Sequence, residues 1–210
     1  MKATVIIPAF NEEKTIKGVI TPLKDVDLIE EIIVVSDGSL DKTAAIAREC
    51  GAMVVELKEN IGKGGAIKEG LKRCSGDAIL FLDADLVGLT KNHVLQLTKP
   101  VLEKAVDMTI GIFTNGRVIT DFAHRLTPFL SGQRCVTGRI INDLYDADIS
   151  RFGVETVLTR IVSSKNINVK EVFLENLTHV MKEEKMGLIK GFAARVKMYW
   201  EIVKTLSNAR

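Results

Sequence analysis

Asp77-Ala78-Ile79-Leu80-Phe81-Leu82-Asp83-Ala84-Asp85-Leu86 is a short apolar run that ends in two carboxylates. The apolar residues 78–82 predict a strand buried on both faces of a sheet. Side chains alternate along an extended chain, so we expect Asp83 and Asp85 to point to one side and Ala84 to the other. The sequence therefore predicts half of a cation site at the carboxyl end of a buried strand.

Two carboxylates in this position suit a divalent metal. Mg²⁺ and Mn²⁺ prefer oxygen ligands in octahedral geometry, and one or two carboxylates commonly hold them while substrate phosphates and water complete the coordination. An Asp-x-Asp at a strand end can also begin a turn or cap the next helix. The pair taken alone leaves both interpretations open.

The composition is that of one globular α/β domain. The chain has 210 residues, of which 46% are hydrophobic and 27% charged, and its net charge is +2. This length suits a single domain with its own core, and the near-neutral charge argues against a nucleic-acid partner. We expect no signal peptide and no transmembrane segment. Three well-separated cysteines fit neither a disulfide framework nor a zinc site, so a reducing cytoplasm is expected.

The first half of the chain alternates strands and helices. Strands are predicted at 2–8, 31–36, 53–57 and 78–82, and helices at 12–21, 42–50 and 60–73. We expect Pro8 to end the first strand, Asn11 to cap the first helix and Pro22 to end it. This order predicts a parallel, doubly wound sheet. Ligands of such sheets bind beyond the carboxyl ends of the strands, where the loops 9–12, 36–39, 62–65 and 83–85 should converge.

The alternation fails in the second half of the chain. A helix from Asn92, interrupted at Pro100, precedes a strand at 108–113, and 131–138 is expected to be a loop or short strand. Further helices are predicted at 117–130, 153–164 and 188–206, and a strand at 169–174. We predict a single domain, with a nucleotide-binding half at 1–115 and an acceptor-binding half at 116–210.

Four ordered motifs carry a family resemblance. They are Val5-Ile6-Ile7-Pro8-Ala9-Phe10-Asn11-Glu12-Glu13, Val34-Val35-Ser36-Asp37-Gly38-Ser39-Leu40-Asp41-Lys42-Thr43, Gly62-Lys63-Gly64 and Leu82-Asp83-Ala84-Asp85. In this order they resemble the family-2 type glycosyltransferases of the GT-A fold. Gly153-Val154-Glu155 and Asn176-Leu177-Thr178-His179 follow, so within that group the chain is similar to the glucosyl-3-phosphoglycerate synthases.

The resemblance implies roles for the matched residues. It implies that the nucleotide sugar is bound by Pro8, Ala9, Phe10, Glu12, Asp37, Lys63, Asp83 and Ala84. It implies Mg²⁺ or Mn²⁺ as cofactor, with Asp83, Asp85 and His179 as ligands, and Asp85 and Glu155 as catalytic residues. A metal on the diphosphate neutralises the charge that grows on the leaving nucleoside diphosphate, so no protein nucleophile is required.

Each role has a structural alternative. Lys63 could be a solvated lysine in a glycine-rich turn, and Asp37 could simply begin one. Glu155 could be a first-turn acid favoured by the helix dipole. A lone histidine is more often a surface or core residue than a ligand; we assign His93 and His124 to that class, and treat His179 as a ligand because it follows a late strand.

The acceptor site is predicted at Gly132, Gln133 and Arg134, where the resembling synthases bind a phosphorylated acceptor. An arginine can grip a phosphate or carboxylate with two donors. The alternative is that Arg134, like the nearby Arg117, Arg125 and Arg139, covers a helix surface. The sequence departs from the pattern of the inverting members of the resembling family, because no adjacent acid pair that could act as a base lies near Glu155. Within that resemblance, the departure favours retention of the anomeric configuration.

The leading hypothesis is a metal-dependent transfer of a hexose, glucose from UDP-glucose, to a small phosphorylated acid such as 3-phosphoglycerate. The predicted helix 188–206 combines aromatic and basic residues, which fits packing on the domain, a homodimer contact or a membrane surface. A polyprenyl phosphate or glycolipid acceptor is therefore the second hypothesis. A nucleotidyltransferase or a non-catalytic nucleotide-binding module ranks lower, because the loop after the first strand is acidic and lacks glycine.

Overall fold

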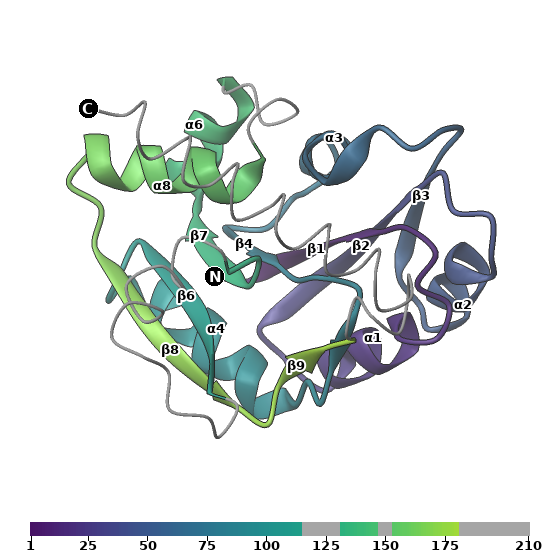
Figure 1. The fold of residues 1–210 in the computed structure, drawn as a ribbon. Helices are drawn as coiled ribbons and strands as arrows, with labels where there is room; N and C mark the ends of the chain where they lie inside the picture. Colours follow the sequence, from purple (N-terminus) through teal and green to yellow (C-terminus); the bar gives the residue numbers. More distant parts are fainter. Residues whose placement is uncertain (115–130, 147–152, 181–210) are drawn as a thin grey trace, which may run out of the picture. The chain divides into compact units, whose positions relative to one another are not determined.

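A computed structural model describes residues 1–114, 131–146 and 153–180 (Figure 1). The chain divides into two compact units, Met1–Thr178 and His179–Arg210. Nearly all described residues belong to the first unit. The predicted helices 117–130 and 188–206 lie outside the described residues, and the predicted nucleotide and acceptor halves stay a prediction.

The described elements follow the predicted alternation through the first half. The helices are α1 (Ile16–Lys24), α2 (Thr43–Glu49), α3 (Gly62–Leu71), α4 (Lys91–Leu102), α6 (Gly138–Asp146) and α8 (Val154–Ser164). The strands are β1 (Ala3–Ala9), β2 (Ile29–Asp37), β3 (Met53–Leu57), β4 (Ala78–Phe81), β5 (Leu86–Val87), β6 (Met108–Thr114), β7 (Arg134–Thr137), β8 (Val169–Glu175) and β9 (Thr178–His179).

Seven strands form one mostly parallel sheet in the order β3-β2-β1-β4-β7-β6-β8. Strand β1 runs parallel to β2 and to β4, β2 runs parallel to β3, and β6 runs parallel to β8. Strand β7 runs antiparallel between β4 and β6. Strands β5 and β9 form a separate two-stranded sheet. The predicted doubly wound, mostly parallel sheet is confirmed.

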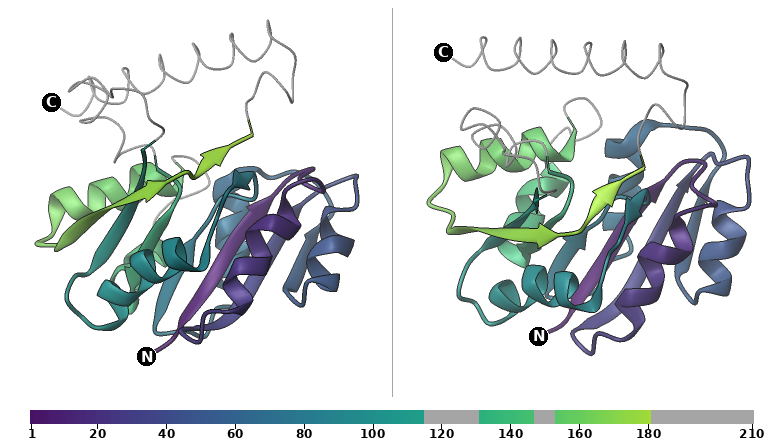
Figure 2. Two further views of the ribbon diagram at one scale, coloured as in Figure 1. Left: turned by 90° about the horizontal axis from the view of Figure 1, so that it is seen from below. Right: turned by 60° about the horizontal axis from the view of Figure 1, so that its bottom comes forward.

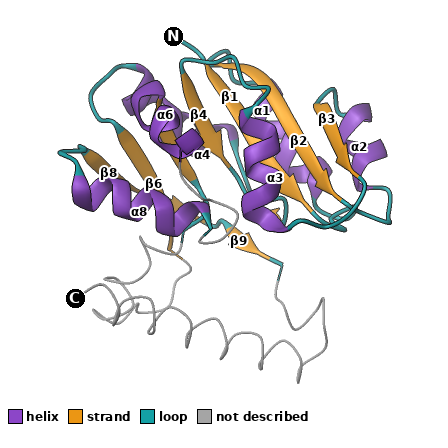
Figure 3. Cartoon of the chain, turned by 90° about the horizontal axis from the view of Figure 1, so that it is seen from above, coloured by secondary structure: helices purple, strands orange, loops and turns teal. Residues whose placement is uncertain are grey.

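Helices cover both faces of the seven-stranded sheet (Figures 2 and 3). One face packs against α1 and α4, with Val5 and Leu80 pointing into that layer. The other face packs against α3, α6 and α8 and receives Ile6, Ile79 and Phe81. Neighbouring residues of β1 and β4 thus serve opposite layers, as the alternation along a strand requires. This explains why the run 78–82 is apolar throughout.

Three predictions for the first strand and helix are wrong. Pro8 lies inside β1, which continues to Ala9, and not at its end. It is tolerated there because the pairing of β1 with β4 already ends at Ile6, so no ladder bond on that side is lost. Pro22 lies within α1, whose N-cap is Thr15. Asn11 is not the cap: its φ is 56° and its side chain accepts a hydrogen bond from another loop.

The second half differs from prediction at two places. Pro100 does not interrupt α4, which runs through it to Leu102. The range 131–138 contains the short strand β7, a central strand of the sheet, which agrees with the predicted loop or short strand, whereas α6 follows it without any predicted counterpart. The predicted helix 153–164 and strand 169–174 are present as α8 and β8. Among the described residues, no helix is both long and apolar enough to cross a lipid bilayer.

Candidate active site

The loop after β2 is fixed to the start of α3. Asp37 is 3% exposed, and its two carboxylate oxygens accept hydrogen bonds from the backbone N–H of Ile61 at 2.8 Å and of Gly62 at 2.9 Å. These N–H groups have no partner inside the helix, and a carboxylate suits the positive end of its dipole. Gly38 follows at φ +68°, and a Cβ there would come within 2.6 Å of the Asn60 nitrogen. Asp37 thus holds the entry of α3 at the carboxyl edge of the sheet.

The loops after β1 and β2 are joined by a network of hydrogen bonds. The N–H of Glu12 donates to the Thr43 hydroxyl at 2.8 Å, and the N–H of Glu13 donates to Asp41 at 3.1 Å. The Asn11 side chain accepts from the N–H of Leu40 at 2.8 Å. The predicted convergence of these loops is therefore present in the structure. Phe10 keeps 46% of its surface exposed beside this network.

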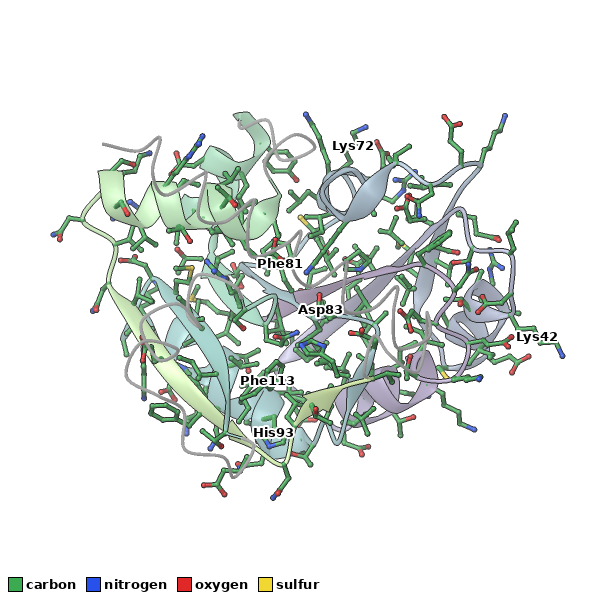
Figure 4. All side chains as sticks on the ribbon, viewed as in Figure 1. Lys42, Lys72, Phe81, Asp83, His93 and Phe113 are labelled. Carbon is green, nitrogen blue, oxygen red and sulfur yellow. The ribbon has the colours of Figure 1, made fainter. Side chains whose placement is uncertain are left out.

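The two aspartates of the central motif follow β4 directly. Figure 4 shows Asp83 just beyond Phe81, where β4 ends. Ala84 and Asp85 form a turn rather than a continuation of the strand. Ala84 is 4% exposed, whereas both aspartates are half-buried, and one carboxylate oxygen of each lies within 4.8 Å of the other. The expected grouping of the carboxylates is present, although a turn produces it.

Lys63, the second residue of α3, bridges two carboxylates. Its Nζ lies 2.6 Å from Asp83 Oδ1 and 2.5 Å from Glu155 Oε1. Burial by itself lowers the pKa of the Lys63 ammonium, but the charges and hydrogen bonds of Asp83 and Glu155 outweigh burial and raise that pKa above its usual range. The lysine therefore stays charged and links α3, the loop after β4 and α8.

The segment before β7 holds the other oxygen of Asp83. Gln133 Nε2 donates to Asp83 Oδ2 at 2.8 Å, and the Ser131 hydroxyl, which donates to the Gly111 carbonyl at 2.5 Å, contacts Gln133 Oε1 at 3.2 Å. Gly132 lies between these residues. A Cβ at Gly132 would come within 2.5 Å of Asp83 Oδ2 and 2.8 Å of Lys63 Nζ. A larger residue at this position would therefore displace the Asp83 carboxylate and the Lys63 ammonium.

Arg134 lies inside the sheet. Its side chain belongs to β7, only 1% of its surface is exposed, and its Nε donates to the Ser131 carbonyl at 2.9 Å. Burial lowers the pKa of Arg134 to about 10, and the negative charge of Glu155 opposes that shift. The guanidinium is therefore a buried charge near Glu155. Its predicted contact with an acceptor, like those of Gly132 and Gln133, stays a prediction.

Glu155 and the histidines occupy distinct environments. Glu155 lies in the first turn of α8, two residues after the N-cap Gly153, whose φ of 76° favours glycine. It is both the first-turn acid that the dipole favours and a partner of Lys63. His93 is buried and completes a capping box with Thr90 at the start of α4, so its structural assignment is confirmed. His124 lies outside the described residues.

Within the first unit, Asp83 and Asp85 are placed so that their carboxylates could hold a metal together. Two carboxylates and an imidazole are a suitable donor set for Mg²⁺ or Mn²⁺. His179 ends β9 and is the first residue of the second unit. Its role as the third ligand stays a prediction, as do the nucleotide-sugar roles of Pro8, Ala9, Phe10, Glu12, Asp37, Lys63 and Ala84.

Sequence reasoning assigned Gln133 to the acceptor and missed its bond to Asp83. It also missed that Lys63 and Glu155 form an ion pair although they are 92 residues apart. No local pattern reports such contacts. The sequence feature that could have indicated the contact with Asp83 is Gly132, which precedes Gln133. A glycine can mark a place where another group approaches the backbone closely.

Comparison with known proteins shows which protein family this chain is similar to. Residues 4–165 match the family model Glycosyl transferase family 2. A glucosyl-3-phosphoglycerate synthase of Mycobacterium tuberculosis (strain CDC 1551 / Oshkosh) is 32% identical over 167 residues, which cover 67% of this chain and 51% of that protein. A 4,4'-diaponeurosporenoate glycosyltransferase of Staphylococcus aureus (strain MRSA252) is 38% identical over 96 residues, which cover 43% of this chain and 26% of that protein. The chain thus spans about half the length of the synthase, and its match to the second relative covers about a quarter of that protein.

A solved structure agrees with the sequence comparison. It is the crystal structure of glucosyl-3-phosphoglycerate synthase from Mycobacterium tuberculosis in complex with Mn²⁺, uridine-diphosphate and glucosyl-3-phosphoglycerate. The likeness has a TM-score of 0.72 at 28% identity and covers 85% of this chain and 72% of that chain. The predicted resemblance to these synthases is confirmed. This chain therefore belongs to glycosyl transferase family 2 and has the GT-A fold that its motifs predicted.

Proposed function

We propose that this chain catalyses the metal-dependent transfer of glucose from UDP-glucose to a small phosphorylated acid such as 3-phosphoglycerate. The observation that carries the proposal is the group formed by Asp83, Asp85, Lys63 and Glu155 at the carboxyl edge of the sheet. This is the edge where open α/β sheets bind their ligands. The similarity to glucosyl-3-phosphoglycerate synthases supports the choice of donor and acceptor.

The carboxylates of Asp83 and Asp85 fit a divalent metal. Their oxygens are hard donors, they are half-buried, and one from each lies within 4.8 Å of the other. His179 would be the third protein ligand. When bound, Mn²⁺ or Mg²⁺ neutralises the charge that develops on the leaving nucleoside diphosphate.

The other residues would position the substrates. Asp37 is fixed at the carboxyl edge of the sheet by the N–H groups of Ile61 and Gly62, so its carboxylate would orient the nucleoside without moving. The exposed ring of Phe10 offers an apolar surface beside it. Glu155, whose charge is balanced by Lys63 and Arg134, would contact the transferred sugar. The reaction is proposed to retain the anomeric configuration.

The acceptor is the second part of the proposal. Gly132, Gln133 and Arg134 are proposed to lie at the acceptor side. A lipid acceptor is the alternative, supported by the similarity to a diaponeurosporenoate glycosyltransferase.

The test is a mass-spectrometric product assay. Purified protein with Mn²⁺ and UDP-glucose receives 3-phosphoglycerate in one reaction and liposomes of bacterial lipid extract in another. We expect one hexosyl unit on phosphoglycerate, no product after metal removal with EDTA, and recovery on adding Mn²⁺. Proton NMR of the product then distinguishes retention from inversion.

Matched variants make the assay specific. Asp85→Asn and Glu155→Gln should each lower kcat/KM by at least about a hundredfold, the usual effect of losing a group that stabilises a transition state. Glu103→Gln removes an exposed carboxylate of the surface pair with Lys99 and should leave activity unchanged. Full activity of Asp85→Asn with Mn²⁺ present would refute the metal-dependent mechanism. Formation of glucosylated lipid, instead of glucosylated phosphoglycerate, would show that the acceptor is a lipid and not a phosphorylated acid.

A further inference from the structure

We propose that Lys63 is a tethered counter-cation that competes with the divalent metal for Asp83 and thereby sets the metal affinity of the site. Glu155 is the second carboxylate partner of Lys63, and it retains the lysine when a metal displaces the lysine from Asp83. In this proposal Lys63 is a positioning residue that acts through Asp83. The inference rests on the proposed metal-dependent function.

The contacts of Asp83 carry the first step. Lys63 Nζ lies 2.6 Å from Oδ1 of Asp83, and Gln133 Nε2 lies 2.8 Å from Oδ2. Gln133 is neutral and fully buried, so it orients the carboxylate without adding charge. Lys63 brings a full positive charge to the oxygen opposite the one that Gln133 fixes. A divalent metal that approaches Asp83 therefore meets an ammonium already bound there.

The burial of the three charged side chains carries the second step. The Lys63 side chain is 40% exposed, whereas those of Asp83 and Glu155 are 19% and 21% exposed. Of the three side chains, that of Lys63 has the largest exposed fraction. Because its Nζ also lies 2.5 Å from Glu155, it can release Asp83 and still keep one carboxylate partner. Such an exchange needs only a change of side-chain rotamer.

The position of Lys63 in its helix carries the third step. Lys63 is in the first turn of α3, where the helix dipole favours acidic side chains and disfavours a lysine. The dipole is already balanced by Asp37, which accepts from the N–H groups of Ile61 and Gly62. The lysine is thus stabilised by Asp83 and Glu155. Its presence in the first turn of α3 is better explained by a role in the site than by a contribution to helix stability.

The local charges predict the direction of the effect. The described groups of this cluster are the carboxylates of Asp83, Asp85 and Glu155 and the cations Lys63 and Arg134, of which Arg134 interacts with Glu155. With Lys63 present, three negative charges face two positive ones. Without Lys63 the site is one charge more negative, and a divalent cation binds it more tightly.

The experiment is a titration of metal-free protein with Mn²⁺ in the absence of nucleotide. Binding is measured by isothermal titration calorimetry and by electron paramagnetic resonance of unbound Mn²⁺. Lys63→Gln should bind Mn²⁺ about tenfold more tightly than the parent protein, since a unit charge a few ångströms away is removed. Lys63→Met, which keeps the side-chain length, should behave alike. Lys63→Arg keeps the charge and should stay within about twofold of the parent.

Two controls separate this mechanism from a general charge effect. Lys165 forms an ion pair of equal length, 2.6 Å, with Asp143, and Lys165→Gln should leave the Mn²⁺ affinity unchanged. Glu155→Gln should weaken Mn²⁺ binding in the parent, because Lys63 then has Asp83 as its carboxylate partner. In the Lys63→Gln background the same change should have a smaller effect, which a double-mutant cycle measures.

The outcomes distinguish this inference from the proposed function. Asp85→Asn should abolish Mn²⁺ binding; if it does not, the proposed metal site itself is wrong. If Asp85→Asn abolishes binding but Lys63→Gln and Lys63→Met bind Mn²⁺ no more tightly than the parent, the role of Lys63 is refuted and the metal site stands. Thermal unfolding with and without Mn²⁺ gives a second readout, since tighter binding produces a larger stabilisation by the metal.

Discussion

The carboxylate of Asp37, the last residue of β2, accepts a 2.9 Å hydrogen bond from the N–H of Gly62, the first residue of α3. The other oxygen accepts from Ile61 at 2.8 Å. This relationship fixes the start of α3, and through it Lys63, against the edge of the sheet where the aspartates lie. Asp37 is therefore a structural residue as well as a proposed ligand of the nucleoside.

Asp37→Ala should lower the free energy of unfolding by about 2 kcal/mol, because two helix N–H groups lose a charged acceptor. Asp37→Asn retains one acceptor oxygen and should lose roughly half as much. Urea denaturation monitored by circular dichroism measures both. Asp77→Ala is the control, since Asp77 is 54% exposed and accepts from the N–H of Lys2. An equal loss for the alanine variants of Asp37 and Asp77 would contradict this role.

Gly132→Ala should disrupt the cluster around Asp83. Its Cβ would come within 2.5 Å of Asp83 Oδ2 and 2.8 Å of Lys63 Nζ, so both side chains must move. We expect at least a tenfold loss of kcat/KM, which is about 1.4 kcal/mol of transition-state stabilisation. Gly18→Ala is the matched control, because a Cβ at Gly18 in α1 meets nothing within 4 Å. That change should raise the free energy of unfolding by up to about 1 kcal/mol and leave activity intact.

Asp41 should make the loop network dependent on pH. Burial acts to raise the pKa of Asp41, but hydrogen bonds from Thr43 and from the N–H of Glu13 together lower it below its usual 3.8. A depressed carboxyl pKa stabilises the folded state above the unfolded-state pKa and loses that contribution as the pH falls through the folded-state pKa.

Asp41→Asn should therefore cost about 1 kcal/mol at pH 7, the ordinary value of such a hydrogen bond. The difference between the two proteins should shrink as the pH falls below 3.8. Chemical denaturation at a series of pH values measures this. A difference that stays constant down to the lowest pH at which the protein folds would show that the charge of Asp41 contributes nothing.

Cys135 should resist alkylation in the folded protein. It is fully buried in β7, and burial raises the pKa of its thiol well above the usual range, so little reactive thiolate forms. Cys50 and Cys74 are half-buried and should react first. Peptide mapping after timed iodoacetamide treatment at pH 8 gives the three rates. In denaturant the three cysteines should react equally, and equal rates in buffer would contradict the central position of β7.

The sequence alone was sufficient for the alternation of strands and helices through β4, for the mostly parallel sheet, and for the edge of that sheet where the site lies. These features depend on apolar periodicity and on which residues follow each strand, and both are local properties of the chain. The same local reasoning was wrong about the cap of α1 and about Pro22 and Pro100. Contacts between loops overrode the capping preference of Asn11, and packing held both prolines inside helices.

Only the tertiary structure decided what surrounds Asp83. Strand β7 enters antiparallel between β4 and β6 and brings Gly132 and Gln133 to the carboxylate, and α8 brings Glu155 to Lys63. These partners are 50 and 92 residues apart in the chain. Their meeting depends on the order of strands in the sheet and on the helix layers that cover it. Local sequence patterns carry no information on either, because the physical interactions that choose among pairings are long-range packing interactions.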